Sequence, residues 1–181
     1  MNEITLLHAC CGPCASACVP VLKADGRMGA MYFANSNIDT KEEWEKRLEA
    51  AKILAAVEGV PLFVEPYDHE EWLREVAAGL EGEPEKGARC LRCFRYNIGK
   101  AVKFAAENGF GAVTSSLTIS PHKVSAAVFE AGKGAAEGTG VEFLEYDFKK
   151  KDGFLKSLKR AKELGLYRQG YCGCEFSKRA R

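Results

Sequence analysis

The sequence lacks a long hydrophobic run. It has no stretch of about 18 apolar residues, and its N-terminus has no cationic segment followed by an uninterrupted apolar one. We therefore expect no membrane-spanning helix, no export signal and no membrane partner, and we expect a cytoplasmic protein. Internal repeats, low-complexity tracts and obvious linkers are also missing. Residues 1–181 are accordingly predicted to form one domain.

A strong net charge is also missing, but the charges that are present are unevenly distributed. The formal net charge is +1, yet residues 148–181 hold eleven Lys or Arg and three acidic residues, a net charge of +8. Clustered cations attract polyanions such as RNA because they neutralise phosphates and release counterions. A solvated, lysine-rich terminal helix would have the same composition, so both interpretations stay open.

Predicted strands and helices alternate along the chain. Apolar runs closed by Gly, Asn, Pro or Asp predict strands in residues 3–10, 28–37, 61–68, 112–118 and 141–147. Helical patterns occupy residues 40–59, 90–109, 120–138 and 152–165. Thr40 and Glu43 have capping-box spacing, and Ser120 with Pro121 predicts an N-cap and a first helical residue. We predict a single α/β domain with a mostly parallel, doubly wound, Rossmann-like or HUP-like sheet of about five strands and helices on both faces.

Noteworthy side chains follow the predicted strands. In doubly wound sheets, ligands bind beyond the carboxyl ends of the strands. The residues expected at this edge are Cys10, Cys11, Asn35, Asn37, Asp68, Thr118 to Lys123, and Asp147. His8 is expected to pack at the end of the first buried strand. This edge is therefore the predicted site.

The eight cysteines are the strongest compositional signal. They occupy positions 10, 11, 14, 18, 90, 93, 172 and 174. A disulfide framework does not suit a chain of this size without an export signal, so metal or redox chemistry is the better interpretation.

Their spacing narrows the kind of metal site. Cys11 and Cys14 form one CxxC pair and Cys90 and Cys93 another, which alone would suggest a tetrahedral zinc site. The adjacent Cys10 favours an iron-sulfur cluster or two neighbouring metals, because neighbouring thiolates chelate a single ion poorly. Cys18 is interpreted as a small buried hydrophobic residue.

The C-terminal pair suggests different chemistry. Cys172 and Cys174, separated by one glycine, can close only a small, strained disulfide ring, and strained disulfides are easily reduced. We interpret the pair as a redox-active dithiol, with two further metal ligands as the alternative.

Several unusual motifs in a fixed order resemble one family. The segments LLHACCGPC, YD followed by Trp72, CLRCF, SSLTISPHK, DFKK and GLYRQGYCGCEFS resemble the QueH-type epoxyqueuosine reductases, and this resemblance covers nearly the whole chain. It implies a cobalamin-independent iron-sulfur enzyme. Such an enzyme reduces epoxyqueuosine at the wobble position of the tRNA anticodon to queuosine, using an electron donor that the sequence does not identify.

The resemblance also implies roles for individual residues. Cys10, Cys11, Cys90 and Cys93 resemble the ligands of a 4Fe-4S cluster. Cys14 and Asp68 are candidate ligands of an additional mononuclear iron. Cys172 and Cys174 correspond to the redox pair. The candidate proton donors are Asp68, His69 and His122.

Substrate contacts are expected from two segments. The predicted helix start that carries His122 and Lys123 would offer backbone N–H groups and a cation to a phosphate or ring oxygen. Tyr167, Arg168 and Tyr171 combine aromatic faces and positive charge, which suits an unstacked anticodon base.

Three alternatives make different predictions about iron. An ATP-pyrophosphatase-like nucleotide-binding enzyme would share the fold, but the first strand leads to CCGPC instead of a phosphate loop such as SGGxDS. A zinc-stabilised RNA-binding module would contain zinc and no sulfide. A thiol-disulfide oxidoreductase would need only Cys172 and Cys174 and would survive loss of metal.

Overall fold

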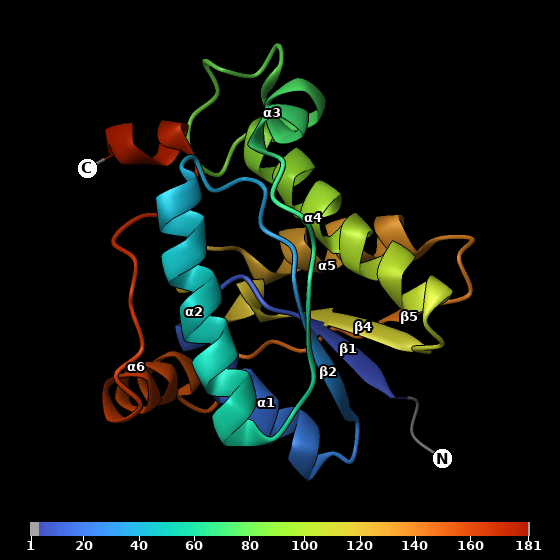
Figure 1. Ribbon diagram of the computed structural model, residues 1–181. Coiled ribbons are helices and arrows are strands. Elements are labelled where there is room, and N and C mark those ends of the chain that lie inside the picture. Colours follow the sequence, from blue (N-terminus) through green and yellow to red (C-terminus); the bar gives the residue numbers. More distant parts are fainter. Residues whose placement is uncertain (1–3, 181) are drawn as a thin grey trace.

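Five parallel strands form the centre of the protein, shown in Figure 1 as a computed structural model that describes residues 4–180. The strands are β1 (Thr5–His8), β2 (Met28–Phe33), β3 (Leu62–Val64), β4 (Ala112–Ser115) and β5 (Glu142–Phe143). All of their pairings are parallel, and the order across the sheet is β3-β2-β1-β4-β5. The predicted parallel sheet is confirmed.

Helices cover both faces of this sheet. One face carries α1 (Gly12–Ala24), α2 (Lys41–Glu58) and α6 (Gly153–Glu163), and the other carries α4 (Ala88–Glu107) and α5 (Ser125–Ala136) (Figure 1). Successive strand residues point to opposite faces. Leu7 and Met31 accordingly enter the first core, whereas Leu6 and Ala30 enter the second. The doubly wound α/β architecture is therefore confirmed.

The start of α2 follows the predicted capping chemistry. The Thr40 side chain accepts a hydrogen bond from the Glu43 backbone N–H at 3.2 Å, which satisfies one of the free donors of the first turn. The helix ends at Glu58, and its C-cap Gly59 has a left-handed φ of 62°. The apolar face that contains Trp44 and Leu48 is buried in the first core.

The start of α5 differs from the prediction. The helix begins at Ser125, so the prediction that Ser120 is its N-cap and Pro121 its first residue is wrong. Ser120 instead closes a turn: its carbonyl accepts from the Lys123 N–H at 3.2 Å, and its hydroxyl accepts from the His122 N–H at 3.3 Å. These local bonds replace the bonds of a first helical turn. Residues 120–123 therefore offer no helix N-terminus.

The segments around the sheet edge are shorter or more irregular than predicted. β4 ends at Ser115 and continues as the 3-10 turn η2 (Ser116–Ile119), and β5 spans only two residues. After β3, the short helix α3 (His69–Trp72) runs into the π-helical turn η1 (Leu73–Ala77).

The C-terminal segment ends in the 3-10 helix η3 (Glu175–Ala180), near the start of α2 and α3 in Figure 1. Ring contacts between Trp72 and Phe176 and a backbone bond from Asp39 to Gly173 join these parts. Within residues 4–180, none of the helices is both long and apolar enough to cross a membrane.

Candidate metal and redox site

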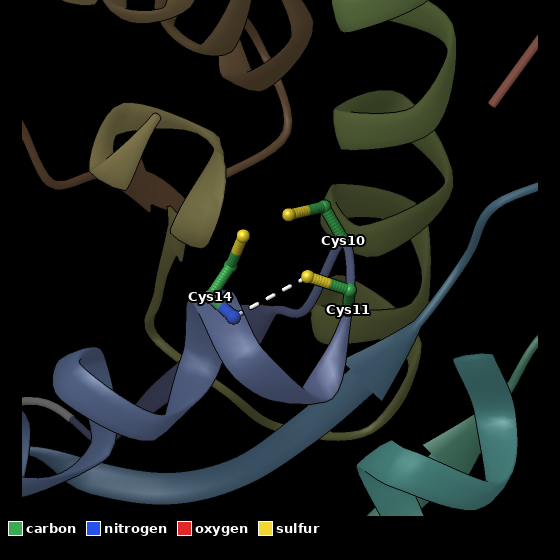
Figure 2. A group of neighbouring side chains, drawn as sticks. All are labelled: Cys10, Cys11 and Cys14. Carbon is green, nitrogen blue, oxygen red and sulfur yellow. Dashed lines mark hydrogen bonds between the residues drawn. The ribbon is translucent and has the colours of Figure 1, made fainter. Parts of the chain in front are cut away.

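Three thiols meet where β1 ends. The sulfurs of Cys10, Cys11 and Cys14 all lie within 4.8 Å of one another. Figure 2 shows them pointing toward a common centre from the β1–α1 turn and the first turn of α1. Among the described residues, this is the one group of three or more metal-ligating side chains at such separations.

The CCGPC sequence explains this turn. Cys11 is the N-cap of α1 in an extended conformation, and its sulfur accepts from the Cys14 backbone N–H at 3.3 Å. Pro13 lies in the first helical turn, where its missing N–H has no cost. A Cβ on Gly12 would stand 2.6 Å from the Ala50 carbonyl, so only glycine lets α2 pack this closely. Local sequence thus creates the triad.

The three thiols differ in acidity. The pKa of Cys11 lies well below its ordinary value, chiefly because the thiols of Cys10 and Cys14 donate hydrogen bonds to its thiolate. Sharing a proton with Cys11 raises the pKa of Cys10 to about 11, and contacts with both neighbours raise the pKa of Cys14 strongly. Cys11 therefore ionises first. Its position at a helix N-terminus is typical of reactive or metal-binding thiolates.

Polar partners behind the triad hold the strand ends together. The Ser116 hydroxyl accepts from the Cys10 N–H at 3.0 Å and donates to the Cys10 sulfur at 3.2 Å. His8 is buried and hydrogen-bonds Ser115 Oγ at 2.9 Å and the Ala34 carbonyl at 3.1 Å, which confirms its packing role. Cys18 is buried in the first core, also as predicted.

A cavity of about 190 Å³ opens beside the triad. Twelve of the residues predicted for the site or its edge line it: Cys10, Cys14, Asn35, Asn37, Cys93, Ser120, Pro121, His122, Lys123, Arg168, Tyr171 and Cys172. An adjoining cleft of about 50 Å³ shares Lys123 and Cys172 with it and is also lined by Cys90. The predicted convergence of cysteines from three distant segments is thus present.

The cavity is predominantly cationic. Arg47, Lys123 and Arg168 line it, with Glu85 as the acidic residue in its wall. Burial opposes the charge of Lys123, but the thiols of Cys172 and Cys10 outweigh burial and raise its pKa. Lys123 is therefore positively charged and lies close to the thiols. An anionic ligand, or thiolates bound to metal, would be stabilised here.

Lys123 sits in a turn that the DFKK segment supports. Lys149 Nζ donates to the Lys123 carbonyl at 2.6 Å and to the Ser120 carbonyl at 3.4 Å. The Thr118 hydroxyl donates to the Tyr146 carbonyl at 2.8 Å and accepts from the Phe148 N–H at 3.2 Å. Two sequence motifs about 30 residues apart thus form one wall.

The C-terminal cysteines face different surroundings. Cys172 is half-buried in the walls of both openings, whereas Cys174 packs with Trp72, Val76 and Ala77. They are two unlinked thiols. Burial raises the pKa of both Cys174 and Cys93, and the Cys172 thiol raises each further.

Other predicted residues lie outside the cavity wall. Asp68 is exposed and caps α3, where its carboxylate accepts from the Glu71 N–H at 2.8 Å. His69 hydrogen-bonds the Ser36 carbonyl at 2.8 Å and packs on Trp72. Tyr167 is exposed and donates to Glu43 at 2.7 Å. The cavity thus brings together four predicted cysteines, Cys10, Cys14, Cys93 and Cys172, with His122, Lys123, Arg168 and Tyr171. Its wall does not include Cys11, Cys90, Cys174, Asp68, His69 or Tyr167.

Sequence reasoning missed several polar residues in the wall: Arg47, Glu85, Asn97 and Gln169. Arg47 lies on the buried face of α2, between Trp44 and Leu48, with Glu43 four residues before it. The oppositely charged pair Glu43 and Arg47 on an otherwise apolar helix face was the sequence signal that could have identified Arg47. Asn97, buried on α4, donates to Asn37 Oδ1 at 3.0 Å and to the Cys93 sulfur at 3.5 Å. Such a contact orients a thiolate and stabilises its charge.

Comparisons with known proteins point to one family. The family model described as "Epoxyqueuosine reductase QueH" matches residues 5–180. A protein of that name from Streptococcus pyogenes serotype M1 is 37% identical over 178 residues, which cover 95% of this chain and 69% of the relative. Its namesake from Histophilus somni is 37% identical and covers 96% of this chain and 72% of the relative. The namesake from Dehalococcoides mccartyi is 35% identical and covers 95% and 91%.

Proposed function

The chain belongs to the epoxyqueuosine reductase QueH family, and we propose that it reduces epoxyqueuosine in the tRNA anticodon to queuosine. The reaction consumes two electrons and two protons: the two C–O bonds of the epoxide break, a C=C bond forms, and the oxygen leaves as water. The observation that carries this proposal is the family match along residues 5–180, which includes every cysteine of the cavity.

The thiols fit a metal centre. The short separations within the triad, the lowered pKa of Cys11 and the nearby Lys123 support a polynuclear, anionic group. We propose Cys10, Cys11, Cys90 and Cys93 as the ligands of a 4Fe-4S cluster. For an additional iron, membership of the triad favours Cys14, whereas Asp68 caps α3 outside the cavity. When bound, such a centre supplies electrons and a Lewis acid for the epoxide oxygen.

Cys172 and Cys174 are the proposed source of the electron pair. Oxidation of two thiols to one disulfide releases two electrons and two protons, which balances the reduction of one epoxide. The position of Cys172 in the same cavity wall as Cys93 supports this role. An external donor of unidentified chemistry then restores the dithiol.

Substrate binding is proposed for the cationic wall. Lys123, Arg168 and His122 can contact phosphate or hydroxyl oxygens, and the Tyr171 ring borders the same cavity. Tyr167, exposed next to Arg168, could contact RNA outside the cavity. We propose a cytoplasmic location, which a tRNA substrate supports. The net charge of +8 in residues 148–181 supports attraction to RNA.

Anaerobic purification followed by iron and sulfide analysis tests the proposal. We expect about four to five irons and four sulfides per chain, an optical band bleached by dithionite, and conversion of epoxyqueuosine in tRNA without added cobalamin. A colourless protein that contains zinc and no sulfide would support the RNA-binding module instead. Turnover that persists after complete removal of metal would support a simple thiol-disulfide oxidoreductase.

A further inference from the structure

We propose that Arg47 is the positioning residue of the Cys172–Cys174 pair: it docks residues 171–173 against α2, and thereby keeps Cys172 in the cavity wall and Cys174 out of solvent. The inference deepens the proposed function, because it rests on the redox role assigned to that pair. The docking of residues 171–173 by Arg47 rests only on contacts within the chain.

The guanidinium of Arg47 is directed at the cysteine segment. Arg47 is only 2% exposed. Its Nη1 donates to the Cys172 carbonyl at 2.8 Å and its Nη2 to the Tyr171 carbonyl at 3.3 Å, across more than 120 residues of sequence. The centroid of the Tyr171 ring also lies 5.1 Å from the guanidinium carbon Cζ of Arg47. Arg47 thus recognises two consecutive peptide groups and one side chain of the segment.

An ion pair alone does not explain this arrangement. Glu43 accepts from Arg47 Nε at 2.8 Å and balances its charge from within the same helix. The terminal nitrogens Nη1 and Nη2 still carry four N–H donors, and a buried N–H without a partner is costly. The carbonyls of Cys172 and Tyr171 accept two of these donors. Removing either side leaves buried polar groups unsatisfied.

Gly173 shows how closely the segment approaches. Its φ of +148° disfavours any residue with a side chain, and an added Cβ would stand 2.9 Å from Asn37 Nδ2 and 3.3 Å from Arg47 Nη1. The Gly173 carbonyl accepts from the Asp39 N–H at 3.0 Å. The glycine between the cysteines is therefore required by docking, in addition to any freedom it gives a disulfide.

The docked position separates the two thiols by environment. Cys172 stays in the cavity wall, and Cys174 packs on Trp72 with 8% exposure. Without Arg47, residues 171–173 lose the two hydrogen bonds that this α2 side chain donates to their backbone carbonyls. The segment should then open locally, while the sheet and its two cores remain.

Differential alkylation of the holoenzyme tests this directly. Trypsin cleavage after Arg168 and Lys178 yields peptide 169–178, which contains Cys172 and Cys174 and no other cysteine. In Arg47→Met, alkylation of Cys174 should accelerate about tenfold or more, because opening then costs fewer charged hydrogen bonds. Cys18, buried in the first core and carried on peptide 1–23, should keep its rate.

Two variants serve as controls. Arg47→Lys keeps the charge and can reach one carbonyl but not two, so its Cys174 rate should lie between those of wild type and Arg47→Met. Arg160→Met removes a 38% exposed arginine that pairs with Glu58, and should leave Cys174 unchanged. If Arg47→Met does not fold, the intermediate rate in Arg47→Lys remains the test.

Two results would overturn the proposal. An unchanged Cys174 rate in the Arg47 variants would show that Arg47 does not dock the segment. Equal acceleration at Cys18 and Cys174 would show a general loss of stability instead. The redox assignment fails separately: if Cys172→Ser retained multiple turnovers, Cys172 would not be the electron source, whatever the alkylation rates.

Discussion

The two cysteine groups that border the cavity are built in different ways. Cys10, Cys11 and Cys14 lie within five consecutive residues, and one strand end followed by one helix start suffices to bring their sulfurs within 4.8 Å. Cys172 instead depends on Arg47 and its neighbours on α2. The first group is a product of local backbone geometry, whereas the second is a product of tertiary packing. A substitution far away in sequence should therefore disturb the second group and spare the first.

The largest effect is expected from the triad. Cys11→Ser removes the thiol with the lowered pKa from the centre of the group. We expect the iron content to fall to background and reductase activity to fall more than about hundredfold, because the proposed cluster would be held directly by thiolates. Iron analysis and a turnover assay measure both effects. Cys18→Ala, in the same helix but outside the triad, should retain its iron. Full iron occupancy in Cys11→Ser would remove Cys11 from the ligand set.

Replacing the C-terminal cysteine pair should stop turnover without loss of metal from the enzyme. In a variant with both Cys172→Ser and Cys174→Ser, we expect multiple turnovers to stop while the optical spectrum and iron content stay as in the wild type. Single-turnover assays with a pre-reduced enzyme isolate this step. Loss of the cluster spectrum would instead identify these cysteines as ligands, and the two groups would then form one metal site.

Glycine substitutions sharpen the comparison through stability. Gly173→Ala places a Cβ against Asn37 at a positive φ, and should destabilise the fold by about 1–3 kcal/mol. Gly99→Ala, inside α4 with nothing within 4 Å of the added Cβ, should stabilise it by about 0.5–1 kcal/mol. Urea unfolding measures both. Equal and small effects would show that residues 171–173 are not tightly docked.

The smallest expected effect is the pH dependence of fold stability that arises from Asp39. Burial opposes the charge of Asp39, yet the Lys178 ammonium and the Tyr171 hydroxyl outweigh burial and lower the pKa of this carboxyl. A lowered pKa stabilises the fold above the unfolded-state value of about 3.9, and this stabilisation is lost as the pH falls through the folded-state pKa. Asp39→Asn should therefore cost about 1 kcal/mol or less at pH 7, and less at pH 2 than at pH 7. Unfolding curves for the two proteins at both pH values test this sign. A penalty that is equal at pH 7 and pH 2 would contradict it.

Much of the fold and part of the site could be predicted because their signals are local. Strand and helix periodicities give a parallel sheet with helices on both faces, and the Thr40–Glu43 spacing marks the start of α2. The carboxyl edge of the sheet then collects the cysteine motifs. The start of α5 was mispredicted because Ser120 and Pro121 suit a turn as well as a helix, and Lys149 from another segment supports the turn.

By itself, the sequence determined the α/β architecture, the cysteine triad and the edge of the sheet at which chemistry is expected, since each depends on residues close together in the chain. Only the tertiary structure decided that Lys123 faces the thiols from a turn and that Arg47 holds the Cys172 segment. These choices depend on contacts between segments about 30 to 130 residues apart. The packing of helices on the sheet fixes such contacts, and no local pattern encodes them.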